Sequence, residues 1–366
     1  MKSGPSLMPR LKGRAWLDAD SRFHLIRDYA AEVVTEDELR ALFAAKSRPR
    51  AYIGFEPSGR LHIGNVITAN MLKRLQRAGC HVTVFLADWH AMINDKFGGN
   101  LERIRACGLY QKEAFLALGL DPASTEFRWA ADFAGDATYW ERVVRAAKAT
   151  SLSRVKRALT IMGRQEDEAE VDASMLIYPA MQVADIFHME LDIAAGGMDQ
   201  RKAHMLARDV CDKTGWKKPV AVHTPLLGSL KGGQRMDPVE HKMSKSDPSA
   251  AVTLNDTPAE VLKKLQKAFC PPTAEGNPVL EMYRYLAFEA LGGKPLTVHR
   301  DAKFGGDAQY DSYSDLEGAF VAGKLHAGDL KAEAARRLIE ITAPVRAHFD
   351  KNPAALEWLN APPQKD

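Results

Sequence analysis

The chain has 366 residues and a formal net charge of +3 at pH 7, with charged residues of both signs interspersed. It exceeds the roughly 250–300 residues at which a single hydrophobic core stops growing, so two domains are expected. The ordinary apolar content excludes a disordered or fibrous chain, and so small a net charge does not by itself indicate nucleic-acid binding.

The cysteines are widely separated and include no C-x-x-C pair; they are Cys80, Cys107, Cys211 and Cys270. This spacing predicts neither a disulfide framework nor a zinc site, and it favours a reducing compartment. The basic N-terminus lacks the apolar run of a secretory signal, and no segment approaches the roughly 20 apolar residues of a membrane span. We therefore expect a cytoplasmic protein without zinc and without membrane contact.

Residues 1–48 are charged and contain helical patches such as "TEDELRALFAAK". Thr35, three residues before Glu38, is typical of a capping box at the start of a helix. The segment is predicted to be an N-terminal helical extension.

Strand and helix patterns alternate from Ala51 onward. A short apolar strand, an amphipathic helix and a second apolar strand predict a βαβ unit with parallel strands. The alternation indicates an α/β, doubly wound parallel sheet over residues 49–256. The expected strands cover residues 51–55, 81–88, 125–130, 191–197 and 219–225, and the later helices cover about 100–117, 138–189 and 200–213.

Helical patterns dominate after residue 256. Thr257 can cap the first of these helices, and Pro258 suits the first helical position. We expect a second, helical domain over residues 257–366.

The stretch "AYIGFEPSGRLHIGN" reads as a strand that enters a loop and then a helix. In a parallel sheet this is where ligands bind, and Ser58, His62, Gly64 and Asn65 stand where a phosphate could dock. The stretch contains neither GxxxxGK[ST] nor GxGxxG, so a P-loop is excluded and a dehydrogenase is disfavoured. A plain turn, with His62 bonded to a backbone carbonyl, fits the same residues.

The stretch "HKMSKSDP" places Lys242 and Lys245 beside small hydroxylated residues. Lysine is a compact charge suited to a triphosphate on which charge develops as a bond breaks. Alone, such a string is more often a solvated surface loop. Together with the upstream HIGN, it indicates a nucleotide site.

In "YPAMQVADIFHM" the spacing of Tyr178, Gln182, Asp185 and Met189 puts these side chains on one face of a helix. Such a stripe often packs in a core, but a buried carboxylate without a partner costs several kcal/mol. Asp185 therefore requires a donor, and a phenol hydroxyl is a suitable one. Tyr52, on the first strand, could add a second hydrogen bond to that hydroxyl.

The stretch "LDIAAGGMDQ" is a predicted strand that ends in a glycine turn. Gly196 and Gly197 allow close approach of a ligand, and Asp199 stands where a ribose hydroxyl could bind. A simple turn followed by a helix cap explains the same residues.

HIGN followed by KMSKS resembles the class I aminoacyl-tRNA synthetases, which have a Rossmann-like (HUP-type) catalytic domain. Longer strings resemble the archaeal type of tyrosyl-tRNA synthetase over about residues 32–345. These strings are "YIGFEPSGRLHIGN", "YPAMQVADIF", "GGMDQRKAHMLARD", "AFCPP", "EGNP" and "KFGGD".

The resemblance implies a role for each matching residue. The tyrosine phenol would contact Tyr52 and Asp185, and the ammonium side would contact Tyr178, Gln182, Gln200 and Glu56. The catalytic contacts to the ATP phosphates would come from His62, Asn65, Lys242 and Lys245. The remaining ATP contacts would come from Gly64, Gly197, Asp199, Ser244 and Ser246. The first anticodon base would contact Phe304 and Asp329 in a C-terminal anticodon-binding domain.

The implied reaction is activation of tyrosine by ATP, with Mg²⁺ as the nucleotide's partner, followed by transfer to tRNA-Tyr. The family also implies a homodimer formed by the helical insertion over residues 137–175. No metal site on the protein itself is expected.

Some positions depart from the family pattern. Phe85 stands where a smaller aliphatic residue is expected, Ala134 where glutamine is expected, and Asn65 where the wider class has a second histidine. No proline follows His326. Three alternatives therefore stay open: the same chemistry with a modified tyrosine or another aromatic amino acid, an adenylating ligase that needs no tRNA, and a tRNA-binding paralogue without activation.

Overall fold

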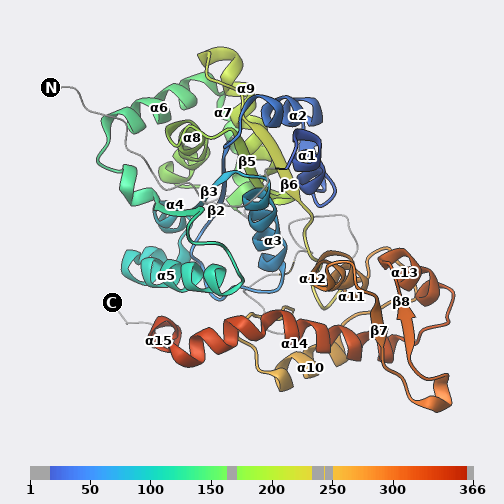
Figure 1. Ribbon diagram of the computed structural model, residues 1–366. Helices are drawn as coiled ribbons and strands as arrows, with labels where there is room; N and C mark the ends of the chain where they lie inside the picture. Colours follow the sequence, from blue (N-terminus) through green and yellow to red (C-terminus); the bar gives the residue numbers. More distant parts are fainter. Residues whose placement is uncertain (1–16, 163–170, 233–242, 244–249, 361–366) are drawn as a thin grey trace.

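The computed structural model describes residues 17–162, 171–232, 243 and 250–360 (Figure 1). Its main sheet has six strands in the order β1-β6-β5-β2-β3-β4. All neighbours pair in parallel except β1, which lies antiparallel to β6 at the edge. The predicted doubly wound sheet is confirmed, with one antiparallel strand added. The strands are β1 Glu32–Val34, β2 Arg50–Phe55, β3 His81–Leu86, β4 Thr125–Trp129, β5 Ile193–Gly197 and β6 Val220–Thr224.

Alternate residues of each strand face opposite sides of the sheet. On β2, Ala51 and Ile53 belong to one hydrophobic cluster with helices α1, α2, α3 and α5, whereas Tyr52 belongs to a second cluster with α6, α8 and α9. The sheet is therefore covered on both faces. The helices of this part are α1 Ala19–Arg27, α2 Glu36–Ala45, α3 Gly64–Arg77, α4 Asp88–Ile93, α5 Leu101–Ala117, α6 Ala137–Ala149, α7 Leu152–Ala158, α8 Ala173–His188 and α9 Arg201–Thr214.

The N-terminal segment contains more than the predicted helices. The capping box of Thr35 and Glu38 begins α2 as expected, but β1 precedes it and joins the main sheet. A three-residue strand is too short to show a periodic pattern, so β1 could not be predicted. The segment is thus partly a continuation of the sheet rather than a purely helical extension.

The C-terminal part is mainly helical. Thr257 caps α10, with Pro258 in its first turn, as predicted. A short antiparallel hairpin, β7 Leu296–Val298 and β8 Ala308–Tyr310, was not predicted. Figure 1 shows the long α14 and α15 running beneath α5, where the ring of Phe349 stacks on Tyr110. The helices are α10 Pro258–Lys267, α11 Pro278–Met282, α12 Phe288–Leu291, α13 Tyr313–Val321, α14 Ala327–Lys351 and α15 Ala354–Asn360, with a π-helical turn over Tyr283–Ala287.

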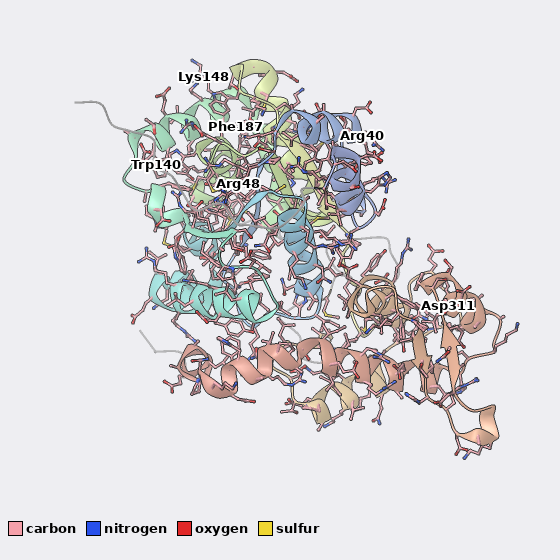
Figure 2. The ribbon with its side chains drawn as sticks, in the orientation of Figure 1. Arg40, Arg48, Trp140, Lys148, Phe187 and Asp311 are labelled. Atoms are coloured by element: carbon pink, nitrogen blue, oxygen red, sulfur yellow. The ribbon has the colours of Figure 1, made fainter. Side chains whose placement is uncertain are left out.

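Charged and aromatic side chains are distributed as expected for helices packed on a sheet. Figure 2 shows Arg40 of α2 and Lys148 of α6 at the periphery, whereas Phe187 of α8 contacts the ring of Trp216 at 4.5 Å. Among the described residues, no helix combines the length and apolar character needed to cross a membrane.

Asp192 joins the beginnings of the two central strands. Its buried carboxylate accepts the backbone N–H of Arg50 at 2.8 Å and contacts the ammonium groups of Lys46 at 2.6 Å and Lys217 at 2.8 Å. Burial is the largest influence on the Asp192 pKa and raises it, but the bonds from Lys217, Lys46 and Arg50 outweigh burial, so the net pKa is lowered.

We expect Asp192→Asn to lower the free energy of unfolding at pH 7 by about 2 kcal/mol, because hydrogen bonds to a charged group are lost. A carboxylate whose pKa is lower in the folded state stabilises the fold at any pH above its pKa in the unfolded state. This stabilisation is lost as pH falls through the pKa of the folded state. The difference in free energy of unfolding between wild type and Asp192→Asn should therefore shrink as pH falls below 3.8, the ordinary pKa of an aspartate. Urea denaturation between pH 7 and pH 3 measures this.

Lys217→Met is the matched control for Asp192→Asn. The Lys217 side chain is 72% exposed, so its loss should cost about 0.5 kcal/mol or less. A difference between wild type and Asp192→Asn that grows toward low pH would contradict the assigned role.

Candidate active site

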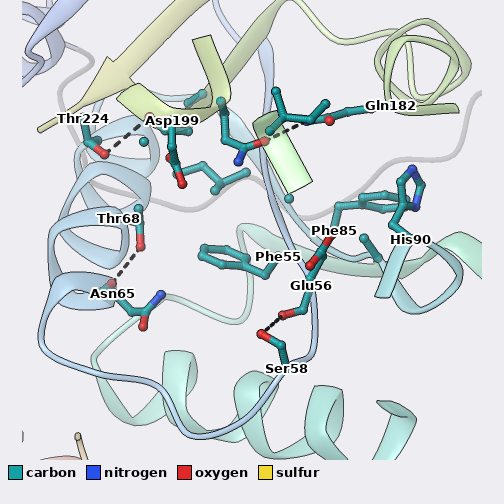
Figure 3. A pocket seen from close by; sticks show the side chains of 18 of the residues that line it. Phe55, Glu56, Ser58, Asn65, Thr68, Phe85, His90, Gln182, Asp199 and Thr224 are labelled. Carbon is teal, nitrogen blue, oxygen red and sulfur yellow. Dashed lines mark hydrogen bonds between the residues drawn. The ribbon is translucent and has the colours of Figure 1, made fainter. Parts of the chain in front are cut away.

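A cavity of about 700 Å³ opens at the carboxyl ends of β2 and β5. This is the switch point of the sheet, because β3 follows β2 on one side and β6 follows β5 on the other. Figure 3 shows Asn65 and Thr68 of α3 across the cavity from Gln182, Phe85 and His90. The predicted residues that line it are Tyr52, Glu56, Ser58, His62, Gly64, Asn65, Tyr178, Gln182, Asp185, Gly196, Gly197, Asp199 and Gln200.

The loop between β2 and α3 is ordered by its own polar side chains. The Asn65 Oδ1 accepts the backbone N–H of His62 at 3.0 Å, and the His62 Nδ1 accepts the N–H of Gly64 at 3.1 Å. A neutral His62 ring therefore carries its proton on Nε2, where it can donate. A Cβ on Gly64 would lie 2.8 Å from the His62 ring, so glycine is needed to seat that ring. Both contacts lie within the turn, so they are compatible with a plain turn as well as with a phosphate site.

The glycine turn after β5 is equally constrained. A Cβ on Gly197 would lie 2.5 Å from the Oδ1 of Asp199, so the turn leaves space for that carboxylate only because residue 197 is glycine. Asp199 lines the cavity and lies above Thr68 of α3 in Figure 3. A carboxylate at this point can accept from a hydroxyl, as a ribose contact requires.

The predicted stripe on α8 faces the cavity with three of its four residues. Tyr178 donates to Glu56 Oε1 at 2.6 Å, and the amide of Gln182 donates to Gln200 Oε1 at 3.0 Å. Burial, and then the charge of Glu56, raises the pKa of the Tyr178 phenol. The fourth residue, Met189, is packed in the core instead.

Asp185 is 1% exposed and is already contacted by two protein groups. The hydroxyl of Tyr139 on α6 donates to its Oδ1 at 2.9 Å, and the Nε2 of His90 on α4 lies 3.1 Å from its Oδ2. The second contact is an ion-pair distance without normal hydrogen-bond geometry. Burial is the largest influence on His90 and lowers its pKa, but the Asp185 charge leads the opposing influences and the net pKa is raised.

Sequence reasoning missed both partners of Asp185. Tyr139 and His90 lie 46 and 95 residues from it along the chain, on other helices, and neither stands in a recognisable motif. The requirement that a buried carboxylate have donors was the available signal, but it did not say which residues supply them. His204, which also lines the cavity, was missed in the same way.

Tyr52 lies on β2 with its ring 6.5 Å from Phe85 and 6.4 Å from His204. Burial, and then the charge of Asp185, raises the pKa of its phenol, so it remains a neutral donor. The Phe85 ring stacks on Phe133 with centroids 5.9 Å apart and lines the cavity.

Ala134, the other departure near the pocket, does not line the cavity. Its carbonyl accepts from the indole N–H of Trp140 at 3.0 Å. Of Phe85 and Ala134, only Phe85 lies in the cavity wall.

Some predicted residues lie outside this cavity or outside the described residues. Lys242, Ser244, Lys245 and Ser246 lie outside the described residues. Met243, between them, is described: it lines the cavity, and its N–H donates to the Leu227 carbonyl at 2.9 Å.

The predicted anticodon residues stand in the C-terminal part. Phe304 ends a 3₁₀ turn, Ala302–Phe304, and Asp329 lies in the first turn of α14. Among the residues described, no group of three or more His, Cys, Asp or Glu could hold a metal ion.

Residues 44–343 match the sequence profile of the tRNA synthetases class I (W and Y). A tyrosine–tRNA ligase from Sulfurisphaera tokodaii is 50% identical over 342 residues, which cover 91% of this chain and 94% of that protein. The chain belongs to this family.

Solved structures of the family have the same fold. The tyrosyl-tRNA synthetase of Aeropyrum pernix superposes with a TM-score of 0.84 at 46% identity, covering 94% of this chain and 98% of that one. The synthetase of Pyrococcus horikoshii, solved with L-tyrosine, gives a TM-score of 0.88 at 41% identity, covering 94% of this chain and 100% of that one. This class I synthetase is thus similar to tyrosine-type relatives along almost its whole length.

We expect Tyr139→Phe to lower the free energy of unfolding by about 1–2 kcal/mol, because the buried carboxylate of Asp185 loses a hydrogen-bond donor. The ring contact with Phe133, at 5.6 Å, is kept, so little packing is lost. Tyr313→Phe, which removes a partly buried hydroxyl bonded to Glu317, is the matched control and should cost less. Equal losses in urea denaturation would show that the Asp185 contact has no special weight.

Proposed function

We propose that this chain activates tyrosine with ATP, releasing pyrophosphate, and then transfers the tyrosyl group to the 3′ end of tRNA-Tyr. The family match and the tyrosine–tRNA ligases among its relatives support this activity. The observation that carries the amino-acid assignment is the buried carboxylate of Asp185 in the wall of the cavity that Tyr52 also lines. A carboxylate there can accept a hydrogen bond from a phenol hydroxyl, whereas an unsubstituted ring offers it no donor.

The phenol end of the substrate is assigned to Asp185 and Tyr52. A carboxylate offers about four lone-pair positions, so the contacts from Tyr139 and His90 leave capacity for the substrate hydroxyl. A site built to pair a hydroxyl rejects phenylalanine by a factor of order 10⁴–10⁵, a range for which tyrosyl-tRNA synthetases are themselves the established example.

The ammonium end is assigned to the polar pairs above the phenol site. Tyr178, Gln182 and Gln200 offer oxygen acceptors, and Glu56 supplies negative charge through its bond to Tyr178. Because these groups are already paired with one another, they are held in place before the amino acid arrives, which lowers the entropy cost of binding.

The ATP end is assigned to the α3 and β5 sides of the cavity. His62 and Asn65 would contact the phosphates beside Gly64, while Asp199 and the Gly197 turn would hold the ribose. Lys242 and Lys245, with Ser244 and Ser246, would contact the departing pyrophosphate. The lysine charges would balance the phosphates together with Mg²⁺, which enters as the partner of the nucleotide.

The reaction would be an in-line attack of the tyrosine carboxylate on the α-phosphate. The nucleophile is already ionised, so no general base is required. Rate enhancement would come from positioning of the reactants and from neutralising the charge that develops on the leaving pyrophosphate.

The tRNA contacts and the dimer are further parts of this proposal. Phe304 and Asp329 would stack on and accept from the first anticodon base, as suits an unstacked base. A homodimer through residues 137–175 is supported by large apolar side chains exposed there: Val144 is 64% and Leu152 is 60% exposed. Large apolar side chains exposed on the surface are candidates for burial in an interface.

Amino-acid-dependent exchange of pyrophosphate into ATP tests the function directly. The panel contains tyrosine, phenylalanine, tryptophan and tyrosines substituted on the ring, followed by charging of tRNA-Tyr. We expect exchange with tyrosine at least about 10⁴-fold more efficient than with phenylalanine. A preference for a ring-substituted tyrosine would indicate that Phe85 shapes the pocket for a modified tyrosine. Exchange without charging would favour the adenylating ligase, and no exchange with any amino acid would favour the binding paralogue.

Lys245→Ala tests the nucleotide end. We expect it to lower the rate of adenylate formation by about 10²-fold or more while tyrosine binding changes little, because the lysine acts on charge developing in the transition state. Lys351→Ala, an exposed lysine at the end of α14, is the charge-matched control. Single-turnover kinetics and equilibrium tyrosine binding provide the two readouts. Equal losses in both would overturn the role given to Lys245.

A further inference from the structure

Two buried histidines beside the cavity have no part in the reaction described above. His204 on α9 is 1% exposed and lines the cavity, while His223 on β6 is completely buried. Their rings stack with centroids 5.1 Å apart, and the His204 Nδ1 lies 3.1 Å from the His223 Nε2. The histidines are therefore joined by a hydrogen bond.

The pair is anchored at its outer end by Glu32. The Nδ1 of His223 lies 2.9 Å from the Oε2 of Glu32, which is directly opposite His223 in the antiparallel pairing of β1 with β6. Arg201 contacts the same carboxylate at 2.8 Å, and its hydrogen bond is the main reason that the pKa of Glu32 is lowered. Glu32 is thus an ionised acceptor at the partly exposed edge of the sheet.

The direction of each hydrogen bond follows from this anchor. Burial lowers the pKa of His223 although the Glu32 carboxylate opposes this, so the ring is neutral at pH 7 and carries one proton. An ionised carboxylate only accepts, so that proton lies on Nδ1 and the His223 Nε2 must accept. The His204 proton then lies on Nδ1, and its Nε2 keeps a free lone pair. Burial, and then the neighbouring His223, lowers the pKa of His204 to about 3, so the ring is uncharged at neutral pH.

The inner end of this series of hydrogen bonds, His204, lies at the amino-acid side of the cavity. The His204 ring lies 6.4 Å from the ring of Tyr52, and a Cβ on Gly196 would stand 3.2 Å from the His204 Cε1. The cavity wall is therefore shaped around this imidazole. A charged ring here would repel the substrate ammonium, whereas a neutral ring with a free lone pair would not.

We propose that Glu32, through His223, is a positioning residue that holds His204 as a neutral acceptor in the wall of the amino-acid pocket. The assignment of the pocket to an amino acid rests on the proposed function, but the tautomer of His204 does not. The charged groups that face the two histidines are Glu32, Arg201 and Asp199 at the His223 end, and Asp185 near Tyr52 at the His204 end.

The tautomer can be observed without any activity measurement. In ¹⁵N-histidine-labelled full-length protein, long-range ¹H–¹⁵N spectra should show His204 with its proton on Nδ1 and a bare Nε2. A proton on Nε2, or a doubly protonated ring at neutral pH, overturns the proposal.

Glu32→Gln is the diagnostic variant, because its amide can donate as well as accept. His223 can then reverse, and the His204 signals should shift toward the Nε2-protonated form. Arg201→Gln is the matched control: it removes the ion pair with Glu32 but leaves the acceptor in place, so the tautomer should not change. Unchanged His204 signals in Glu32→Gln overturn the proposal.

The kinetic readout separates positioning from general damage. Glu32→Gln should raise the KM for tyrosine about tenfold, as expected for one misdirected buried hydrogen bond, and leave the KM for ATP near wild type. Equal increases in both constants would indicate a merely structural role and overturn the proposal. Wild-type protein with no tyrosine-dependent exchange but the expected tautomer would instead refute the proposed function.

Discussion

The parallel pairing of β2 with β3 on one side and β5 on the other determines the rest of the site. Because the chain leaves the sheet in opposite directions from these two strands, their carboxyl ends leave a space that no crossover helix fills. Tyr52 points to one face of that space, while the loop after β2 carries His62 to α3. One pairing thus places Tyr52 and His62 in the wall of a single cavity.

Burial of charge is the second constraint, and the structure meets it with pairs. The buried Asp185 is contacted by Tyr139 and His90, and the partly buried Glu56 accepts from Tyr178 and Asn94. An unpaired buried carboxylate would protonate or destabilise the fold, so these partners are needed before any substrate binds. The same partners also hold the carboxylates still, which favours binding of a substrate without rearrangement.

The sequence predicted those parts of the protein whose contacts are local. Strands of five or six residues, the capping box at Thr35, the N-cap at Thr257 and the loop that carries His62 were all found, because neighbouring residues decide them. The strand β1 and the hairpin of β7 and β8 were missed, because three residues carry no periodic signal. Their formation depends on partner strands far away in the chain.

The candidate site divides in the same way. The stripe on α8 was predicted from helical spacing, yet one of its members, Met189, packs in the core, since spacing fixes a face but not its extent. Tyr139, His90 and His204 could not be found, because each is defined by a partner on another element. A sequence can indicate that a buried carboxylate needs a hydrogen-bond donor, but only the folded structure shows which residue supplies it.

The least predictable element is also the one that links the edge of the sheet to the cavity. The register of β1 against β6 sets Glu32 opposite His223, and antiparallel partners in direct opposition project their side chains to the same face. A shift of one residue would turn Glu32 to the other face and leave His223 without its acceptor. The short strand therefore contributes a fixed hydrogen-bond direction as well as an edge, and that direction is transmitted through two rings to the wall beside Tyr52.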